Sequence, residues 1–184
     1  MMNLYNTLSG KKESVSQSAL TFYACGITPY DYAHLGHGRC FIVFDVLYRF
    51  FKSQNQQITY CRNFTDIDDK LLARAHKELG DSLRYKEIAD RYIDAYLQDM
   101  DSLNCLFPDH QPRVTQVIPE IIAFIEGLIA KGHAYQVGSD VYFRVTSFKG
   151  YGQLSKRNLD DLQAGARVEI NEKRKPLRFC FMEG

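Results

Sequence analysis

The chain has 184 residues, 23 basic and 22 acidic side chains, and a formal net charge of +1. Its 45% hydrophobic and 24% charged residues are typical of a globular protein and exclude a disordered chain. There is no apolar run of about 18 residues and no basic-then-apolar start, so we predict a cytoplasmic protein without a membrane span or secretory signal. The balanced charge excludes a uniformly basic chain but allows a local nucleic-acid surface.

The five cysteines are widely spaced, odd in number and form no C-x-x-C pair. This pattern is typical of a reducing compartment and not of a disulfide framework. We interpret four of them as small buried residues: Cys40, Cys61, Cys105 and Cys180. Cys25 differs from these because of its neighbours.

The first 64 residues predict a strand, a loop, a helix and a second strand. Residues 19–25 are apolar with β-branched and aromatic members, and Gly26 then opens a loop. Residues 40–51 carry apolar side chains at three- and four-residue spacings, which predicts a buried helix. Residues 57–64 predict the second strand. We therefore expect a βαβ unit with parallel strands and a right-handed crossover.

Thr65 follows the second strand and is a favourable N-cap, so we predict that a helix starts there. Asp66, Asp68 and Asp69 fall in its first turn, where acidic groups complement the helix dipole. We interpret these three carboxylates as helix-start charges and surface pairs and not as ligands.

Two further helices have an apolar face, one from Ile88 to Leu103 and one from Val117 to Leu128. The proline-punctuated stretch at 105–112 between them is a predicted boundary. Short strands at 134–137 and 140–145 predict a hairpin, and the rest of the chain predicts a compact, turn-rich tail.

The stretch His34-Leu-Gly-His37 lies at the predicted strand-to-helix junction. A helix N-terminus offers free N–H groups and a positive dipole end to phosphate, and Gly36 would let a nucleotide approach the backbone. Two imidazoles three residues apart can both donate to a phosphate that undergoes displacement. Taken alone, such a pair is more often a helix cap and a surface group. Zinc is a weaker alternative, because this spacing has no nearby carboxylate or cysteine ligand.

The motif is embedded in further stretches: Cys25-Gly-Ile-Thr-Pro-Tyr-Asp31, Gly38-Arg39 and Arg62-Asn-Phe-Thr-Asp-Ile-Asp-Asp-Lys70. Together they closely resemble the cysteinyl-tRNA synthetase family of class I aminoacyl-tRNA synthetases. His34–His37 is similar to that family's HIGH signature, with Leu35 in the variable position. Later stretches resemble the family's inserted domain: Gly132–Tyr135, Tyr151–Ser155, Asn158–Leu162 and Ala164–Val168. The resemblance covers nearly the whole chain.

The resemblance implies an α/β fold class. Residues 1–112 would form the first half of a Rossmann-like parallel nucleotide-binding domain of the HUP, or class I synthetase, type. Residues 113–184 would form a truncated α+β connective-peptide insertion.

The resemblance also implies an activity, the ATP-dependent conversion of cysteine to cysteinyl-adenylate and its transfer to tRNA(Cys). His34 and His37 would be the catalytic residues that contact ATP, which would bring Mg²⁺ with it. The implied ATP-binding residues are Ile27, Thr28, Pro29, Tyr30, His34, Leu35, Gly36 and His37.

Cys25, Gly26 and Thr65 would line the amino-acid pocket. Cys25 would also be one ligand of a Zn²⁺ that binds the substrate thiolate, because zinc prefers sulfur and so discriminates against serine.

The family's other zinc ligands, its KMSKS loop and its tRNA-binding regions have no match here, and the chain departs from the family pattern at Arg178–Gly184. We therefore expect a truncated chain that is inactive alone and that self-associates or needs the missing C-terminal half. Two alternatives remain: a paralogous cysteine:amino-sugar ligase, and a non-catalytic nucleotide-binding remnant.

Basic residues cluster in the second half of the chain at Lys149, Lys156, Arg157 and Lys173–Lys175. They are a candidate contact for an RNA acceptor stem, with a solvated charged face as the alternative.

Overall fold

The computed structural model describes residues 2–16, 18–156 and 178–182. The described residues of Met1–Ser16 and Pro119–Gly184 form one compact unit, and those of Gln17–Ile118 form the other. Within the described ranges, no helix is both long and apolar enough to cross a membrane. The division of the family's domains at residue 112 stays a prediction.

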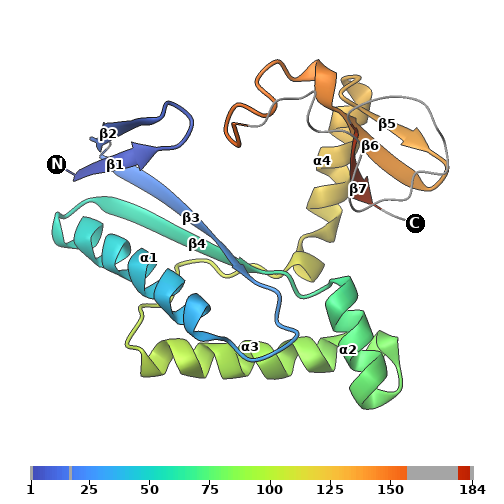
Figure 1. Ribbon diagram of the computed structural model, residues 1–184, viewed down its shortest axis with the longest axis horizontal. Helices are drawn as coiled ribbons and strands as arrows, with labels where there is room; N and C mark the ends of the chain where they lie inside the picture. Colours follow the sequence, from blue (N-terminus) through green and yellow to red (C-terminus); the bar gives the residue numbers. More distant parts are fainter. Residues whose placement is uncertain (1, 17, 157–177, 183–184) are drawn as a thin grey trace. The chain divides into compact units, whose positions relative to one another are not determined.

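The Gln17–Ile118 unit is built on the predicted βαβ element (Figure 1). Strand β3 (Ala19–Ile27) and strand β4 (Gln57–Phe64) pair in parallel, and helix α1 (Leu35–Ser53) connects them. The predicted βαβ element with parallel strands is confirmed, with β4 at its predicted bounds. The helix starts five residues before the apolar run, because a cap at His34 holds its first turn.

The stretch predicted as a boundary, residues 105–112, contributes to the sheet. His110 bridges to Cys61 and Arg113 to Phe64, both in parallel, and the Arg62 N–H donates to the His110 carbonyl at 3.0 Å. The sequence does not reveal this role, because prolines argue against a strand. Pro112 has no N–H to donate, but its carbonyl still accepts from the Phe64 N–H.

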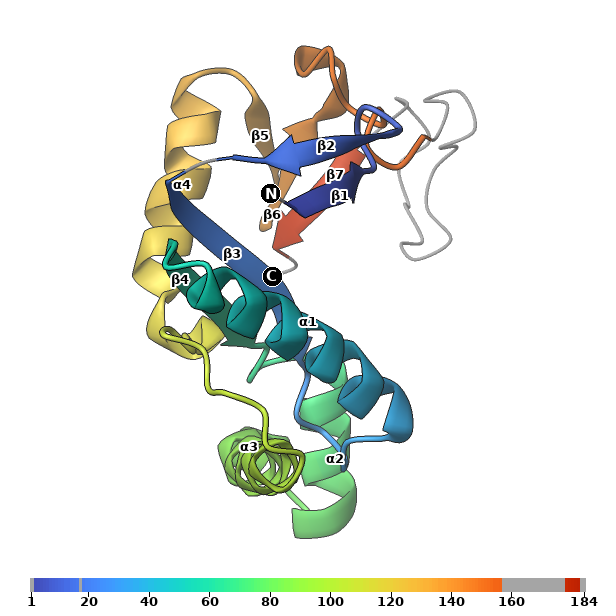
Figure 2. The ribbon, with the colours of Figure 1, turned by 90° about the vertical axis from the view of Figure 1, so that its left-hand side faces the viewer.

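Helices α1 and α3 (Tyr85–Ser102) cover one face of the sheet, with α3 seen end-on in Figure 2. The predicted apolar face of α3 is confirmed at Ile88, Tyr92, Tyr96 and Met100, which are buried, but not at Leu103, which follows the helix and is exposed. The main core cluster comes from both helices, both strands and the following loop: Ile27, Phe41, Phe64, Ile93, Tyr96, Met100 and Cys105.

A charged side chain, Arg62, lies inside this core and is only 2% exposed. Its guanidinium carbon is 4.5 Å from the ring centre of Phe41 and 5.2 Å from that of Tyr96. Cation–π contacts of this kind are attractive and are stronger when the cation is desolvated. Burial raises the pKa of the Tyr96 phenol, so that ring stays neutral beside the cation.

The prediction that Thr65 caps the next helix is wrong. Helix α2 (Asp69–Leu79) is capped by Asp68, whose carboxylate accepts from the Lys70 N–H at 2.9 Å. Thr65 lies four residues before the first helical residue, and its N–H donates to the Ile27 carbonyl at 3.0 Å, which holds it at the end of the sheet.

Asp66 also differs from its interpretation as a surface charge, since it is 3% exposed. Its carboxylate accepts from the Thr115 N–H at 3.0 Å and from the Thr115 hydroxyl at 2.5 Å. It therefore joins the end of β4 to the short 3₁₀ helix Val114–Gln116.

The interpretation of the cysteines is corrected in part. Cys105 is buried as expected, but Cys40 is exposed on α1 and Cys61 is half-buried. Tyr60 and Arg62 are on the strand face that α1 and α3 cover. Cys61 lies on the opposite face, away from these two helices. The side chain of Cys180 lies outside the described residues.

The second unit holds a hairpin that the sequence did not predict, formed by β1 (Met2–Asn6) and β2 (Lys11–Val15). Helix α4 (Ile118–Ala130) and the predicted hairpin of β5 (Ala134–Val137) and β6 (Asp140–Arg144) follow, and β7 (Arg178–Met182) pairs with β6. Their small core contains Ile125, Ala134 and Val141. The predictions for residues 157–177 lie outside the described part of the chain.

We predict that Asp66→Ala lowers the free energy of unfolding by about 1–3 kcal/mol, because it leaves the Thr115 N–H and hydroxyl without their hydrogen-bond acceptor. The matched control is Asp69→Ala in the exposed first turn of α2, which should change it by less than about 0.5 kcal/mol. Urea denaturation followed by circular dichroism measures both. Equal effects of the two variants would contradict the buried role of Asp66.

Candidate active site

The candidate site lies where β3 and β4 end and α1 begins. Ile27 and Phe64 are register partners at these strand ends, and Thr65 is tied to Ile27. The structure thus brings together Cys25, Gly26 and Thr65, which are all at the carboxyl edge. Ligands of parallel α/β sheets bind at this edge.

Strand β3 contains one extra residue at Cys25–Gly26, seen as a register shift between Ala24 and Ile27. A β-bulge of this kind re-aims a side chain, and here the Cys25 thiol is exposed. A Cβ at Gly26 would lie 1.5 Å from the Asn63 carbonyl oxygen, so only glycine fits. The Gly26 N–H donates to Asn63 Oδ1 at 2.9 Å. The sequence did not single out Asn63, because nothing in the pattern of a strand reveals a bulge opposite it.

His34 and His37 together cap α1. The Gly36 N–H donates to His34 Nδ1 at 3.0 Å, and the His34 N–H donates to His37 Nδ1 at 3.1 Å. Since both Nδ1 atoms accept, each neutral ring carries its proton on Nε2. The rings are stacked with centroids 3.9 Å apart. The cap therefore leaves two neighbouring Nε2–H donors for a ligand.

Gly36 supports this arrangement for a reason that the sequence did not suggest. A Cβ at Gly36 would lie 2.8 Å from His34 Cε1, closer than real Cβ contacts allow. Any side chain there would displace the capping imidazole. The expected approach of a nucleotide to Gly36 stays a prediction.

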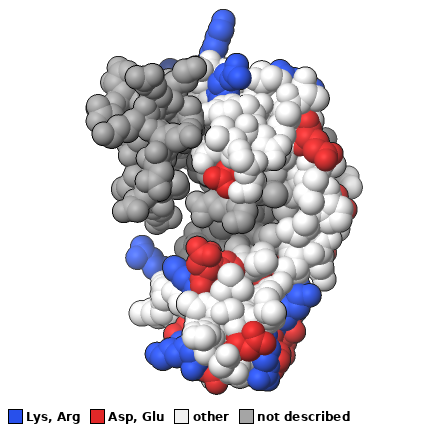
Figure 3. Space-filling view, turned by 90° about the vertical axis from the view of Figure 1, so that its right-hand side faces the viewer, with Lys and Arg blue, Asp and Glu red and all other residues white. Residues whose placement is uncertain are grey.

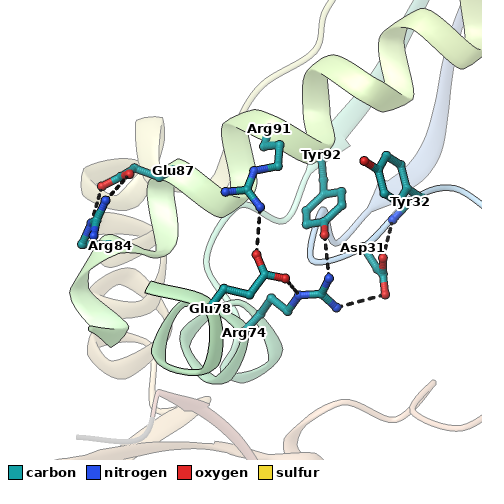
Figure 4. Close-up of polar contacts among 8 residues, drawn as sticks. All are labelled: Asp31, Tyr32, Arg74, Glu78, Arg84, Glu87, Arg91 and Tyr92. Carbon is teal, nitrogen blue, oxygen red and sulfur yellow. Dashed lines mark hydrogen bonds and ion pairs between the residues drawn. The ribbon is translucent and has the colours of Figure 1, made fainter. Parts of the chain in front are cut away.

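The loop between β3 and α1 is held by an ion pair from α2, which further polar contacts join to α3 (Figure 4). Arg74 is at the centre: its Nη1 donates to Asp31 at 3.2 Å, its Nη2 donates to the Tyr92 hydroxyl at 2.7 Å, and its Nε pairs with Glu78. Arg91 reaches Glu78 at 2.8 Å. The hydrogen bond from Arg74 lowers the pKa of the Glu78 carboxyl, which keeps it ionised.

Aromatic contacts hold the same loop at two other residues. The Lys70 ammonium lies 5.0 Å from the ring centre of Tyr30, and Tyr32 packs edge-on against Tyr92 at 5.1 Å. Pro29 is fully buried. The predicted ATP-binding residues therefore sit on a loop anchored at several points.

The described residues do not fit a zinc site. Cys25 offers one sulfur, and the described part of the chain contains no group of three His, Cys, Asp or Glu side chains that could hold a metal ion. A tetrahedral site needs four ligands. We therefore assign no metal-dependent step to these residues.

Comparison with known proteins identifies the family. The model of the class I (C) tRNA synthetase catalytic domain matches residues 11–183. The chain belongs to this family. Relatives named cysteine–tRNA ligase include those of Geobacter sp. strain M21, at 46% identity over the whole chain, and Aquifex aeolicus, at 50% over 98% of it. The chain spans about 38% of the length of the Geobacter relative and 37% of the Aquifex one.

Solved structures confirm the predicted fold class. A Campylobacter jejuni chain described as an arginyl-tRNA synthetase superposes with a TM-score of 0.55 over 72% of this chain and 39% of its own, at 11% identity. The Agrobacterium radiobacter K84 LeuRS in complex with tRNA and LeuAMS gives 0.52 over 69% of this chain and 16% of its own, at 20% identity. At these identities the likeness supports the fold alone.

The pH dependence of the histidine pair provides a test. Burial, and then the neighbouring His34, lower the pKa of His37 below its ordinary value of 6.5. The unfolded chain therefore binds this proton more readily, so the contribution of His37 to stability is complete above that value. It is lost as the pH falls from 6.5 toward the folded pKa. An NMR titration should show His37 titrating below 6.5.

His34→Asn is the matched variant, because asparagine retains a capping oxygen but removes the neighbouring imidazole. It should bring the His37 pKa part of the way back, since burial remains the larger cause. A His37 that titrates above 6.5 in the unsubstituted chain would contradict the arrangement.

Proposed function

We propose that this chain carries the adenylate-forming half-site of a cysteine–tRNA ligase. The activity would be the reaction of ATP with cysteine to give cysteinyl-adenylate and pyrophosphate, followed by transfer of cysteine to tRNA. The observation that carries the proposal is the pair of Nε2–H donors at the N-terminus of α1, in the unit that also presents Cys25 and Thr65.

In this proposal His34 and His37 donate from Nε2 to phosphate oxygens of ATP. Because the pKa of His37 is lowered, that ring is neutral near pH 7 and acts as a hydrogen-bond donor. The N-terminal dipole of α1 adds positive potential at the same point. Loop residues 27–30 would border the nucleotide, and Mg²⁺ would accompany ATP.

Cys25, Gly26 and Thr65 would form the amino-acid pocket. The exposed thiol of Cys25 is the one soft ligand that these residues would contribute to a zinc ion, and zinc would supply thiolate selectivity when bound. Since Cys25 stands alone, the companion ligands would have to come from residues other than those described.

The acceptor in the second step distinguishes this proposal from an amino-sugar ligase. The names of the curated relatives favour tRNA as the acceptor. Lys149 and Lys156 are exposed and are candidates for RNA contact, while Arg157 and Lys173–Lys175 lie outside the described residues. Figure 3 shows basic and acidic side chains interspersed over its lower part, without a broad area of one sign.

A partner surface is also part of the proposal. Among the described residues, β3 pairs with β4 alone, so its other edge is open. Helix α1 exposes an apolar stripe: Leu35, Ile42, Val43, Val46 and Phe50. Open edges and apolar faces favour association, either with a second copy or with the portion of the relatives that this chain does not span.

We expect the chain to bind ATP and His34→Asn to weaken binding about 10-fold, because asparagine keeps the cap but lacks the Nε2–H donor. The control is His76→Asn on the exposed side of α2, which should stay within about twofold. Isothermal calorimetry with Mg·ATP measures both. Unchanged affinity in His34→Asn would count against the proposed role of the histidines.

We expect no cysteine-dependent exchange of pyrophosphate into ATP by the chain alone. The reason is that the chain has no match to the family's KMSKS loop, and that no complete zinc site exists among the described residues. The full-length Aquifex aeolicus ligase serves as the positive control. Steady exchange by the chain alone would overturn this expectation.

A further inference from the structure

We propose that Asn63 is a positioning residue that sets the directions of the Cys25 thiol and the Thr65 hydroxyl. The amino-acid side of the site would then depend on a residue that itself touches no ligand. This inference rests on the proposed function for the identity of the ligand, although not for the geometry.

The Asn63 side chain contacts three groups at the carboxyl edge of the sheet. Its Oδ1 accepts from the Gly26 N–H at 2.9 Å and from the Tyr23 hydroxyl at 3.0 Å. Its Nδ2 lies 3.5 Å from Thr65 Oγ1 and donates to it. The amide orientation is determined by chemistry, because a backbone N–H can only donate and must face the oxygen.

The hydrogen bond from Gly26 to Asn63 is needed because of the bulge. The extra residue in β3 leaves the Gly26 N–H out of step with the ladder of β4. A backbone N–H that lacks its ladder partner needs another acceptor, and Asn63 Oδ1 is that acceptor. The Asn63 carbonyl fills the space beside Gly26. Main chain and side chain of one residue therefore hold the bulge from which Cys25 projects.

The contact with Thr65 has a separate effect. Because Thr65 Oγ1 accepts from Nδ2, the hydroxyl hydrogen is left to donate elsewhere. The Thr65 backbone is already fixed by its hydrogen bond to Ile27. Asn63 thus orients the hydroxyl as a donor toward an acceptor on the bound amino acid or its adenylate.

Three variants separate these contacts. Asn63→Ala removes all of them. Asn63→Asp keeps the oxygen that accepts from Gly26 and Tyr23 but cannot donate to Thr65. Tyr23→Phe is the matched control, because it removes one donor and leaves the contacts to Gly26 and Thr65 in place.

The first measurement is amide hydrogen exchange by NMR on the full chain. Asn63→Ala should speed exchange at Gly26 about 10-fold or more, while Arg62, whose N–H donates to His110, keeps its rate. Asn63→Asp and Tyr23→Phe should retain the protection of Gly26. Unchanged exchange at Gly26 in Asn63→Ala, or loss of protection throughout β4, would overturn the proposal.

The second measurement compares two probes by calorimetry: Mg·ATP and cysteinyl-sulfamoyl adenosine, a stable mimic of cysteinyl-adenylate. Asn63→Ala and Asn63→Asp should weaken the mimic about 10-fold and leave ATP within about twofold, because only the mimic reaches Thr65. Tyr23→Phe should bind both probes as the unsubstituted chain does. A parallel loss of both probes would show a merely structural role and overturn the proposal.

The two proposals fail differently. If the unsubstituted chain binds neither probe, the proposed function fails. The exchange rate of Gly26 then still decides whether Asn63 holds the bulge.

Discussion

The close approach of β4 to Gly26 is the constraint on which the rest of the site depends. With the Asn63 carbonyl beside it, this position accepts no side chain, and β3 passes only by taking an extra residue. That extra residue turns the Cys25 thiol outward, and the ladder then resumes for its last pair at Ile27 and Phe64. The following loop then leads to the N-terminus of α1, and Thr65 is fixed to Ile27. The positions of Cys25 and Thr65 at the site therefore both depend on the contact between Gly26 and Asn63.

In the histidine pair, the structural role and the proposed functional role do not compete. The cap uses only the Nδ1 atoms of His34 and His37, so it leaves both Nε2–H groups for a ligand. It also fixes the tautomers and stacks the rings, which orients the two donors before any ligand arrives. Preorganised donors cost little reorganisation when negative charge develops nearby. The possibility of a helix cap made the motif ambiguous in the sequence. In the structure, the cap orients the two histidines for the proposed contact with phosphate.

The parts of the fold that follow from periodicity could be predicted from the sequence, since apolar spacing places β4, α1 and the buried face of α3. The start of α2 could not, because Thr65 and Asp68 are both acceptable caps and only the structure shows that the chain stays with the sheet at Thr65 and turns helical after Asp68. Asp66 was misread for a related reason: its partner, Thr115, lies far along the chain. Motifs led to Cys25, Gly26 and the histidines. Asn63 carries no such signal, because its importance arises from a bulge in the neighbouring strand.

The loop between β3 and α1 combines two kinds of restraint, and their difference bears on how it would meet a ligand. Its ends are held by buried or main-chain contacts, through Pro29 and the cap at His34. Its middle is held by the Arg74–Asp31 ion pair, which is open to solvent, and by the aromatic contacts of Tyr30 and Tyr32. Exposed ion pairs contribute little to stability and are screened by salt, whereas buried packing persists. The salt-sensitive contact of the loop is thus the one at Asp31, and the cap that orients the histidines does not depend on it. In the proposed function, this division would let the histidine donors stay in place while the residues around Asp31 adapt to the nucleotide.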